Sequence, residues 1–121
     1  MLGTELYPDA ELCLIRQVLQ HCSNADVAKV LKKLRKYPYV LTTDAQCLGD
    51  KSTKNYDIET FHESRTIYGS GLRLELPPFS IAVKTILEHD YITASNERSE
   101  NSPPMMLRTV LLRHQTDGPI R

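Results

Sequence analysis

The chain has 121 residues, the size of one ordinary domain, and this length excludes a second large domain. Its 15 Lys and Arg residues balance 15 Asp and Glu residues, so no global field draws it to nucleic acid or to a membrane surface. No apolar run is long enough to cross a bilayer, and the first residues lack the pattern of a secretory signal. We therefore expect a cytoplasmic or nuclear protein with no membrane contact.

Residues 1–41 predict a pair of short amphipathic helices joined by a tight turn. Between Asp9 and Cys22 the apolar residues recur at steps of three and four, the spacing of one helical face: Leu12, Ile15, Val18, Leu19 and Cys22. Ser23 or Asn24 is typical of the cap of a second helix, which Pro38 ends. The apolar stripe of that second helix consists of Val27, Val30, Leu31 and Leu34.

Residues 42–55 are rich in turn formers and predict a loop or linker. Residues 56–116 predict a second helical region, with helices over residues 57–68, 79–91 and 103–115. Between the first two of these, Leu72, Leu74 and Leu76 alternate with polar residues and predict an extended connector that packs against the helices. The polar stretch 94–102 predicts a mobile break, and residues 117–121 a frayed tail.

One phrase recurs three times in the chain. "IRQVLQH" at residues 15–21, "VKTILEH" at residues 83–89 and "LRTVLLRH" at residues 107–114 share aliphatic residues, a cation and a closing His, and Pro residues precede each copy. Such repetition favours one structural unit used several times. We therefore expect an all-α fold, a small bundle of about five short amphipathic helices.

The opening segment resembles a known family. Leu6, Tyr7 and Pro8, followed by a helix, an Asn-containing turn and a helix with Val30 and Leu31, are similar to the CUE and UBA families of ubiquitin-binding helical units. The resemblance covers residues 6–37, with echoes at 77–90 and 103–115. It implies that ubiquitin or a related partner meets an apolar helical patch, here formed by Leu6, Tyr7, Pro8, Val30, Leu31 and Leu34.

Ring-between-ring ubiquitin ligases also resemble this chain, because they carry several such helical segments ahead of their catalytic part. Three scattered residues, Cys13, Cys22 and Cys47, cannot build the zinc sites which that part needs. The resemblance therefore implies an accessory relative without ligase chemistry. A competing interpretation is that Val30, Leu31 and Leu34 belong to the core.

Neither metal binding nor catalysis has a local signature. His21, His62, His89 and His114 lack the short spacings of metal ligands, and they suit capping of helix carboxyl ends. Cys47, His62 and Asp57 are the residue types of a thiol catalyst, but such residues occur in most small proteins. We expect no cofactor, no metal and no enzymatic activity.

The basic run from Lys29 to Tyr37 supplies an alternative function. Its cations could contact the phosphates of nucleic acid: Lys29, Lys32, Lys33, Arg35 and Lys36. A helical bundle with such a basic face also resembles the amino-terminal domains of transcription elongation factors. The sequence therefore predicts a non-enzymatic protein-interaction module, with a nucleic-acid-associated or transcription-related helical domain as the alternative. A homodimer stays open, because a thin core can be completed by dimerisation.

Overall fold

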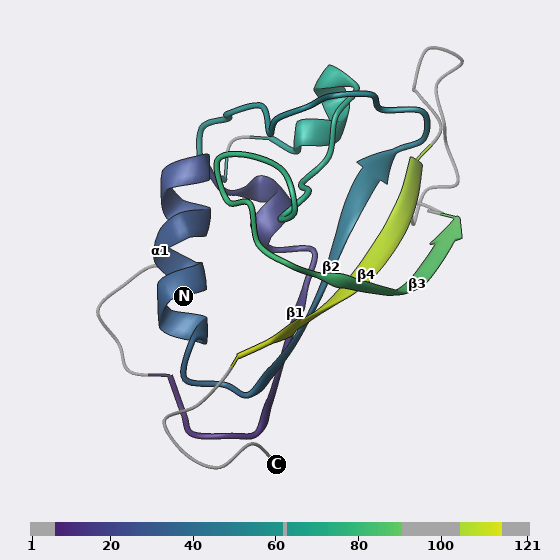
Figure 1. The fold of residues 1–121 in the computed structure, drawn as a ribbon. Helices are drawn as coiled ribbons and strands as arrows, with labels where there is room; N and C mark the ends of the chain where they lie inside the picture. Colours follow the sequence, from purple (N-terminus) through teal and green to yellow (C-terminus); the bar gives the residue numbers. More distant parts are fainter. Residues whose placement is uncertain (1–6, 62, 91–104, 115–121) are drawn as a thin grey trace.

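The structure is a computed structural model that describes residues 7–61, 63–90 and 105–114. The described residues form four strands, one α-helix and two 3-10 helices (Figure 1): β1 (Leu12–Arg16), η1 (Leu19–His21), α1 (Asn24–Leu34), β2 (Tyr39–Cys47), η2 (Arg65–Tyr68), β3 (Lys84–Asp90) and β4 (Met105–Arg113). The predicted all-α helical bundle is therefore wrong, and the fold is α/β.

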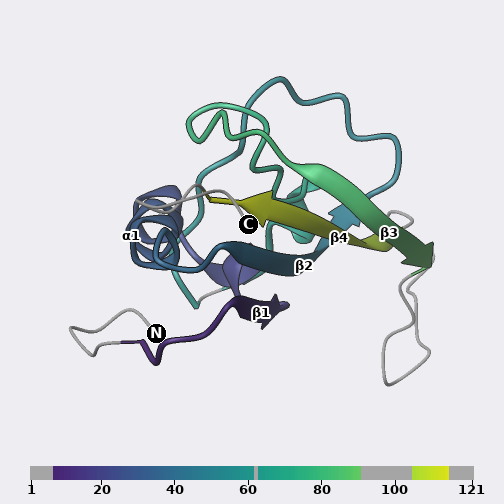
Figure 2. The same cartoon turned by 60° about the horizontal axis from the view of Figure 1, so that its bottom comes forward.

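The four strands make one mixed sheet in the order β1-β2-β4-β3, with β1 and β3 at the edges (Figure 2). Strands β1 and β2 are parallel and are joined through α1, whereas β4 is antiparallel to both β2 and β3. The register aligns Leu14 with Leu41, Leu41 with Leu111, and Leu111 with Lys84. Strands from both halves of the chain thus share a single sheet.

Helix α1 is the predicted second helix, and its cap is confirmed. The Ser23 side chain accepts a hydrogen bond from the backbone N–H of Asp26, which also places a carboxylate in the first turn. The whole predicted stripe of this helix is buried: Val27, Val30, Leu31 and Leu34. Burying each of these side chains contributes about 1.5–3 kcal/mol to folding.

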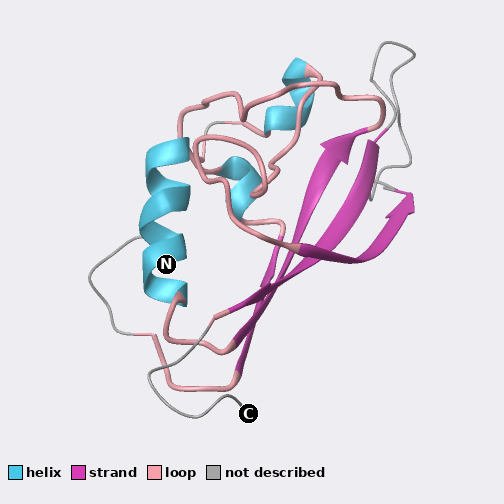
Figure 3. Cartoon of the chain, viewed as in Figure 1, coloured by secondary structure: helices cyan, strands magenta, loops and turns pink. Residues whose placement is uncertain are grey.

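One face of the sheet is covered. Ile15 of β1, Val40 of β2 and Leu112 of β4 belong to the same buried cluster as the stripe of α1. Leu72 and Leu74, from the connector between η2 and β3, join that cluster as predicted, whereas Leu76, predicted to pack with them, is half-buried and does not belong to it. Figures 1 and 3 show α1 and this connector on the same side of the strands.

The connector crosses β2 at very close range. A Cβ atom at Gly71 would lie 2.7 Å from the Cα atom of Gln46, so only glycine fits there without a shift of the backbone. The Gln46 side chain donates to the carbonyl of Leu72 at 2.9 Å. Buried Asn55 donates from its side chain to the carbonyl of Arg73 at 2.8 Å and accepts from its N–H at 2.8 Å. These bonds fix the connector on the covered face.

Five other predicted segments are wrong in whole or in part. Residues 9–22 form β1 and η1 instead of a helix, and β2 extends to Cys47 through the predicted loop. Of the helix predicted over 57–68 only η2 is helical, and the helices predicted over 79–91 and 103–115 give way to the antiparallel strands β3 and β4. The break at 94–102 and the tail at 117–121 lie outside the described residues.

Candidate interaction surface

The structure places the predicted partner-binding residues mostly in the core. Val30 and Leu34 have no exposed surface and Leu31 has little. Tyr7 is half-buried against the same core, while Pro8 is exposed. Leu6 lies outside the described residues. In this fold the leucines of α1 therefore hold the helix on the sheet and present no apolar patch to a partner.

The predicted basic residues lie on α1 and on the two residues that follow it. Lys29, Lys32, Arg35 and Lys36 are exposed, and the ammonium group of Lys33 lies 5.3 Å from the centre of the Tyr7 ring. Lys29 pairs with Asp26 at 3.7 Å, and Lys36 pairs with Asp9 at 3.2 Å. These basic residues form a solvated cationic surface.

Of the three residues considered for thiol catalysis, Cys47, Asp57 and His62, the structure describes the first two. Cys47 is buried, its thiol donates to the carbonyl of Thr66 at 3.3 Å, and burial raises the pKa of that thiol. One Asp57 oxygen accepts from the N–H groups of Asn24 and Ile58. His62 lies outside the described residues, and the described residues contain no group of three or more His, Cys, Asp or Glu side chains placed to hold a metal ion.

A buried polar cluster holds the chain that follows β1. The backbone N–H of Gln20 donates to an oxygen of Asp44 at 3.0 Å, and the Gln20 side-chain oxygen accepts from the N–H of Ala45 at 2.5 Å. These two bonds extend the contact between the first part of the chain and β2 past Arg16, where β1 ends. Burial raises the pKa of Asp44 to about 7, although the Gln20 N–H and the guanidinium of Arg65 oppose the shift.

Arg65 has no exposed surface and lies in the same region. Its guanidinium donates to the carbonyl of Cys22 at 2.6 Å and to the carbonyl of Tyr56. Burial lowers the pKa of this guanidinium, while the carboxylates of Asp57 and Asp44 raise it. Arg65 thus links η2 to the chain at Cys22 and at Tyr56, and its role in the fold is structural.

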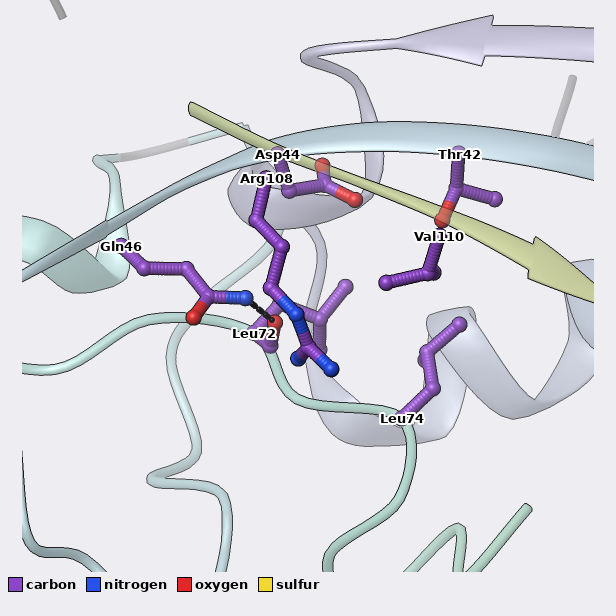
Figure 4. Close-up of a pocket in the computed structure, with 7 residues that line it drawn as sticks. All are labelled: Thr42, Asp44, Gln46, Leu72, Leu74, Arg108 and Val110. Carbon is purple, nitrogen blue, oxygen red and sulfur yellow. Dashed lines mark hydrogen bonds between the residues drawn. The ribbon is translucent and has the colours of Figure 1, made fainter. Parts of the chain in front are cut away.

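A cavity of about 10 Å³ lies beside Asp44, between the sheet and the connector (Figure 4). Its walls come from β2, from β4 and from the connector: Thr42, Asp44, Gln46, Arg108, Val110, Leu72 and Leu74. The Arg108 guanidinium donates to Glu75 at 2.8 Å and to the Thr85 hydroxyl at 2.8 Å. The space is no larger than about one water molecule, so it is a gap within the packing and too small for a substrate.

The opposite face of the sheet is the surface that sequence analysis did not identify. Because side chains alternate along a strand, residues next to those of the buried cluster project from the other side. Two contacts between register partners confirm this orientation. The Thr43 and Thr109 hydroxyls lie 2.7 Å apart, and the Arg113 guanidinium lies 5.8 Å from the centre of the Tyr39 ring.

Apolar side chains gather on this face in neighbouring register rows. We call their set the open sheet face: Leu12, Leu14, Tyr39, Leu41, Leu87 and Leu111. Leu14 is 68% exposed, Leu87 54% and Leu12 47%, and the other three are half-buried. Further along the strands, Ala45, Cys47 and Leu107 are buried, so the open part is the half of the face that includes the start of β2 and the end of β4.

Cations border the open sheet face. Arg16 ends β1, Lys84 begins β3 and Arg113 ends β4, and the side chains of all three are exposed. By the same alternation, no Asp or Glu of the described strand residues projects from this side of the sheet. The surface therefore has an apolar centre and a positively charged rim.

Sequence reasoning missed this surface because the apolar residues were assigned to helices. The local signal for β1 is the short continuous apolar run from Leu12 to Ile15, which suits a strand with apolar side chains on both faces as well as it suits a helix.

Comparisons with known proteins give no relative for this chain. No family model, no curated protein and no solved structure matches it. Within the described residues, no helix has both the length and the apolar character needed to span a bilayer.

Proposed function

We propose that this chain is a non-enzymatic protein-interaction module that binds its partner through the open sheet face. The observation that supports this proposal is the exposure of Leu12, Leu14 and Leu87 on one side of the sheet. A sheet face that is exposed to water usually carries polar side chains, alternating with the apolar residues of the core. Here leucines occupy five of the positions that face away from the core in the open half of the sheet: Leu12, Leu14, Leu41, Leu87 and Leu111.

Contiguity distinguishes these leucines from ordinary surface residues. Single exposed leucines are common on soluble proteins, whereas a continuous apolar patch with a polar rim is typical of an interaction site. Leu14, Leu41 and Leu111 are register neighbours on three adjacent strands, and neighbouring strands in a sheet lie about 5 Å apart. They form one patch.

A matched pair of substitutions tests the proposal. Leu14→Asp places a charge in the open sheet face, and Leu48→Asp makes the same change at a leucine that is 47% exposed after β2 ends. Proteins bound by the wild-type chain in cells would be identified by affinity purification and mass spectrometry, with both variants in parallel. We expect partners to be lost with Leu14→Asp and retained with Leu48→Asp.

Circular dichroism would confirm that both variants fold. A purified partner from that experiment should then shift the NMR signals of Leu14, Leu41 and Leu111. Partners that bind Leu14→Asp as well as the wild type would contradict the proposal.

Ubiquitin is the specific partner that the family resemblance suggests. NMR titration of the labelled chain with ubiquitin separates two modes of binding. Shifts at Leu14 and Leu41 would place ubiquitin on the open sheet face, and shifts centred on Tyr7 and Leu31 would require the packing around α1 to open. The absence of shifts would exclude ubiquitin as a partner under those conditions.

Nucleic acid is a second candidate ligand, and the exposed cations of α1 favour it. Lys32 is exposed on α1 and Arg35 is exposed directly after its last residue, and this helix covers the other face of the sheet. Lys32→Glu with Arg35→Glu should weaken binding to a short DNA duplex and should reduce its salt dependence. Leu14→Asp should leave that binding unchanged, which separates the two candidate functions.

A further inference from the structure

The charges around the open sheet face indicate what kind of partner fits it. Arg16, Lys84 and Arg113 lie at the ends of three different strands, so positive charge borders the apolar centre on more than one side. The strand residues of this face add no carboxylate within the described part of the chain. A complementary partner needs an apolar centre and acidic groups at its borders.

The dimensions of the surface fit a helix. Across the sheet, Leu14, Leu41 and Leu111 span two strand spacings, about 10 Å, which is the width of an α-helix with its side chains. Along β2, Tyr39, Leu41 and Thr43 span two steps of about 6.6 Å each. A helix of about nine residues covers that length at 1.5 Å per residue.

The layer arrangement of the fold favours the same occupant. Helix α1 and the connector cover one side of the sheet, and a helix on the other side would complete the three-layer packing common in α/β proteins. A second copy of this chain fits less well, because two identical open sheet faces would bring together rims made of Arg16, Lys84 and Arg113. Like charges close together oppose such an association.

From these observations, and resting on the proposed function of the open sheet face, we propose that its occupant is an amphipathic helix of a partner protein with acidic residues flanking its apolar stripe. The stripe would carry apolar residues at positions i, i+3, i+4 and i+7, which cover two turns. Leu14, Leu41 and Leu111 contact that stripe, and Arg16, Lys84 and Arg113 pair with the flanking carboxylates.

Three synthetic helical peptides test the proposal. The first has a Leu stripe at i, i+3, i+4 and i+7 with Glu at the flanking positions. The second keeps the stripe and replaces each flanking Glu with Lys. The third has the composition of the first in an order that breaks the stripe. Binding to the full chain would be measured by fluorescence anisotropy at two salt concentrations, and the bound site would be mapped by NMR.

We expect the Glu-flanked peptide to bind about tenfold more tightly than the Lys-flanked peptide, because three exposed ion pairs together supply roughly that factor. Its affinity should fall as salt increases, since exposed charge pairs are screened. The peptide without a stripe should not bind. Shifts should centre on Leu14, Leu41 and Leu111.

Charge reversal of the rim provides the sharpest control. In the variant Arg16→Glu, Lys84→Glu and Arg113→Glu, the preference should invert, so that the Lys-flanked peptide binds more tightly. Lys54→Glu, a charge reversal at an exposed loop residue, should keep the wild-type preference. Equal binding of both striped peptides, or a preference that does not change with the rim, would overturn the proposed charge of the partner.

The outcomes separate this inference from the proposed function. If the Lys-flanked peptide binds better on the same leucines, the face is still an interaction site but the acidic partner is wrong. If no peptide binds, the helical occupant is wrong, and the Leu14→Asp experiment with cellular partners decides the proposed function independently. Binding to vesicles of anionic lipid, lost on rim reversal, would overturn the proposal in favour of a membrane surface. Self-association in sedimentation measurements, lost with Leu14→Asp, would overturn it in favour of a second copy.

Discussion

Asp44 is a fully buried carboxyl group whose protonation should control stability near neutral pH. Burial raises the pKa of Asp44 to about 7, above its value near 3.8 in an unfolded chain. The folded state therefore favours the protonated form, and the stabilisation is complete below about pH 4. It is lost as pH rises toward 7, because ionisation of Asp44 then favours the unfolded state.

Asp44→Asn tests this pH dependence. The amide cannot ionise, so the variant should gain stability relative to the wild type as pH rises from 4.5 to 8, by on the order of 3 kcal/mol at most. Urea unfolding at both pH values would measure the difference. Asp9→Asn, at an exposed carboxylate, is the matched control. A constant difference between Asp44→Asn and the wild type at the two pH values would contradict the account.

Substitutions in helix α1 test whether its apolar stripe belongs to the core or to a binding surface. Leu34 has no exposed surface, so Leu34→Ala should destabilise the chain by about 2–5 kcal/mol through lost burial and a residual cavity. Lys32→Ala, at an exposed position of the same helix, should change stability by less than about 0.5 kcal/mol. Denaturant unfolding measures both values. A negligible cost for Leu34→Ala would mean that the stripe is not packed as described.

The sequence was sufficient to predict α1, its cap and the packing of Leu72 and Leu74, but not the strands. Ser23, Asp26 and the stripe of α1 are local signals of a helix, and local interactions determine where it begins. In β4, by contrast, the run from Met105 to Leu112 has apolar residues that satisfy both helical and strand spacing.

Long-range pairing decided between those two spacings. Strand β4 pairs with both β2 and β3, and the sequence of β4 alone does not reveal that these strands are its partners. The second and third copies of the repeated phrase are β3 and β4, which pair with each other, while the first copy runs from β1 into η1. The open sheet face was missed for the same reason, because its residues come together only when the strands pair in this register.

At the scale of the whole molecule, one face of the sheet is packed and half of the other is apolar and exposed. Because only one face of the sheet is fully packed, this small chain has a modest core and also carries leucines at its surface. The same arrangement separates the basic side of α1 from the open sheet face, so the two candidate ligands would bind on opposite sides of the sheet.

The most direct measurement is methyl NMR of leucine-labelled protein with a soluble paramagnetic agent, before and after the Glu-flanked peptide is added. We expect the agent to broaden the methyl signals of Leu12, Leu14 and Leu87, and to leave those of Leu34 and Leu112 sharp. The peptide should restore the broadened signals. If Leu14 and Leu87 are as protected as Leu34 in the free protein, or if the peptide protects other residues instead, the open sheet face is not the binding surface.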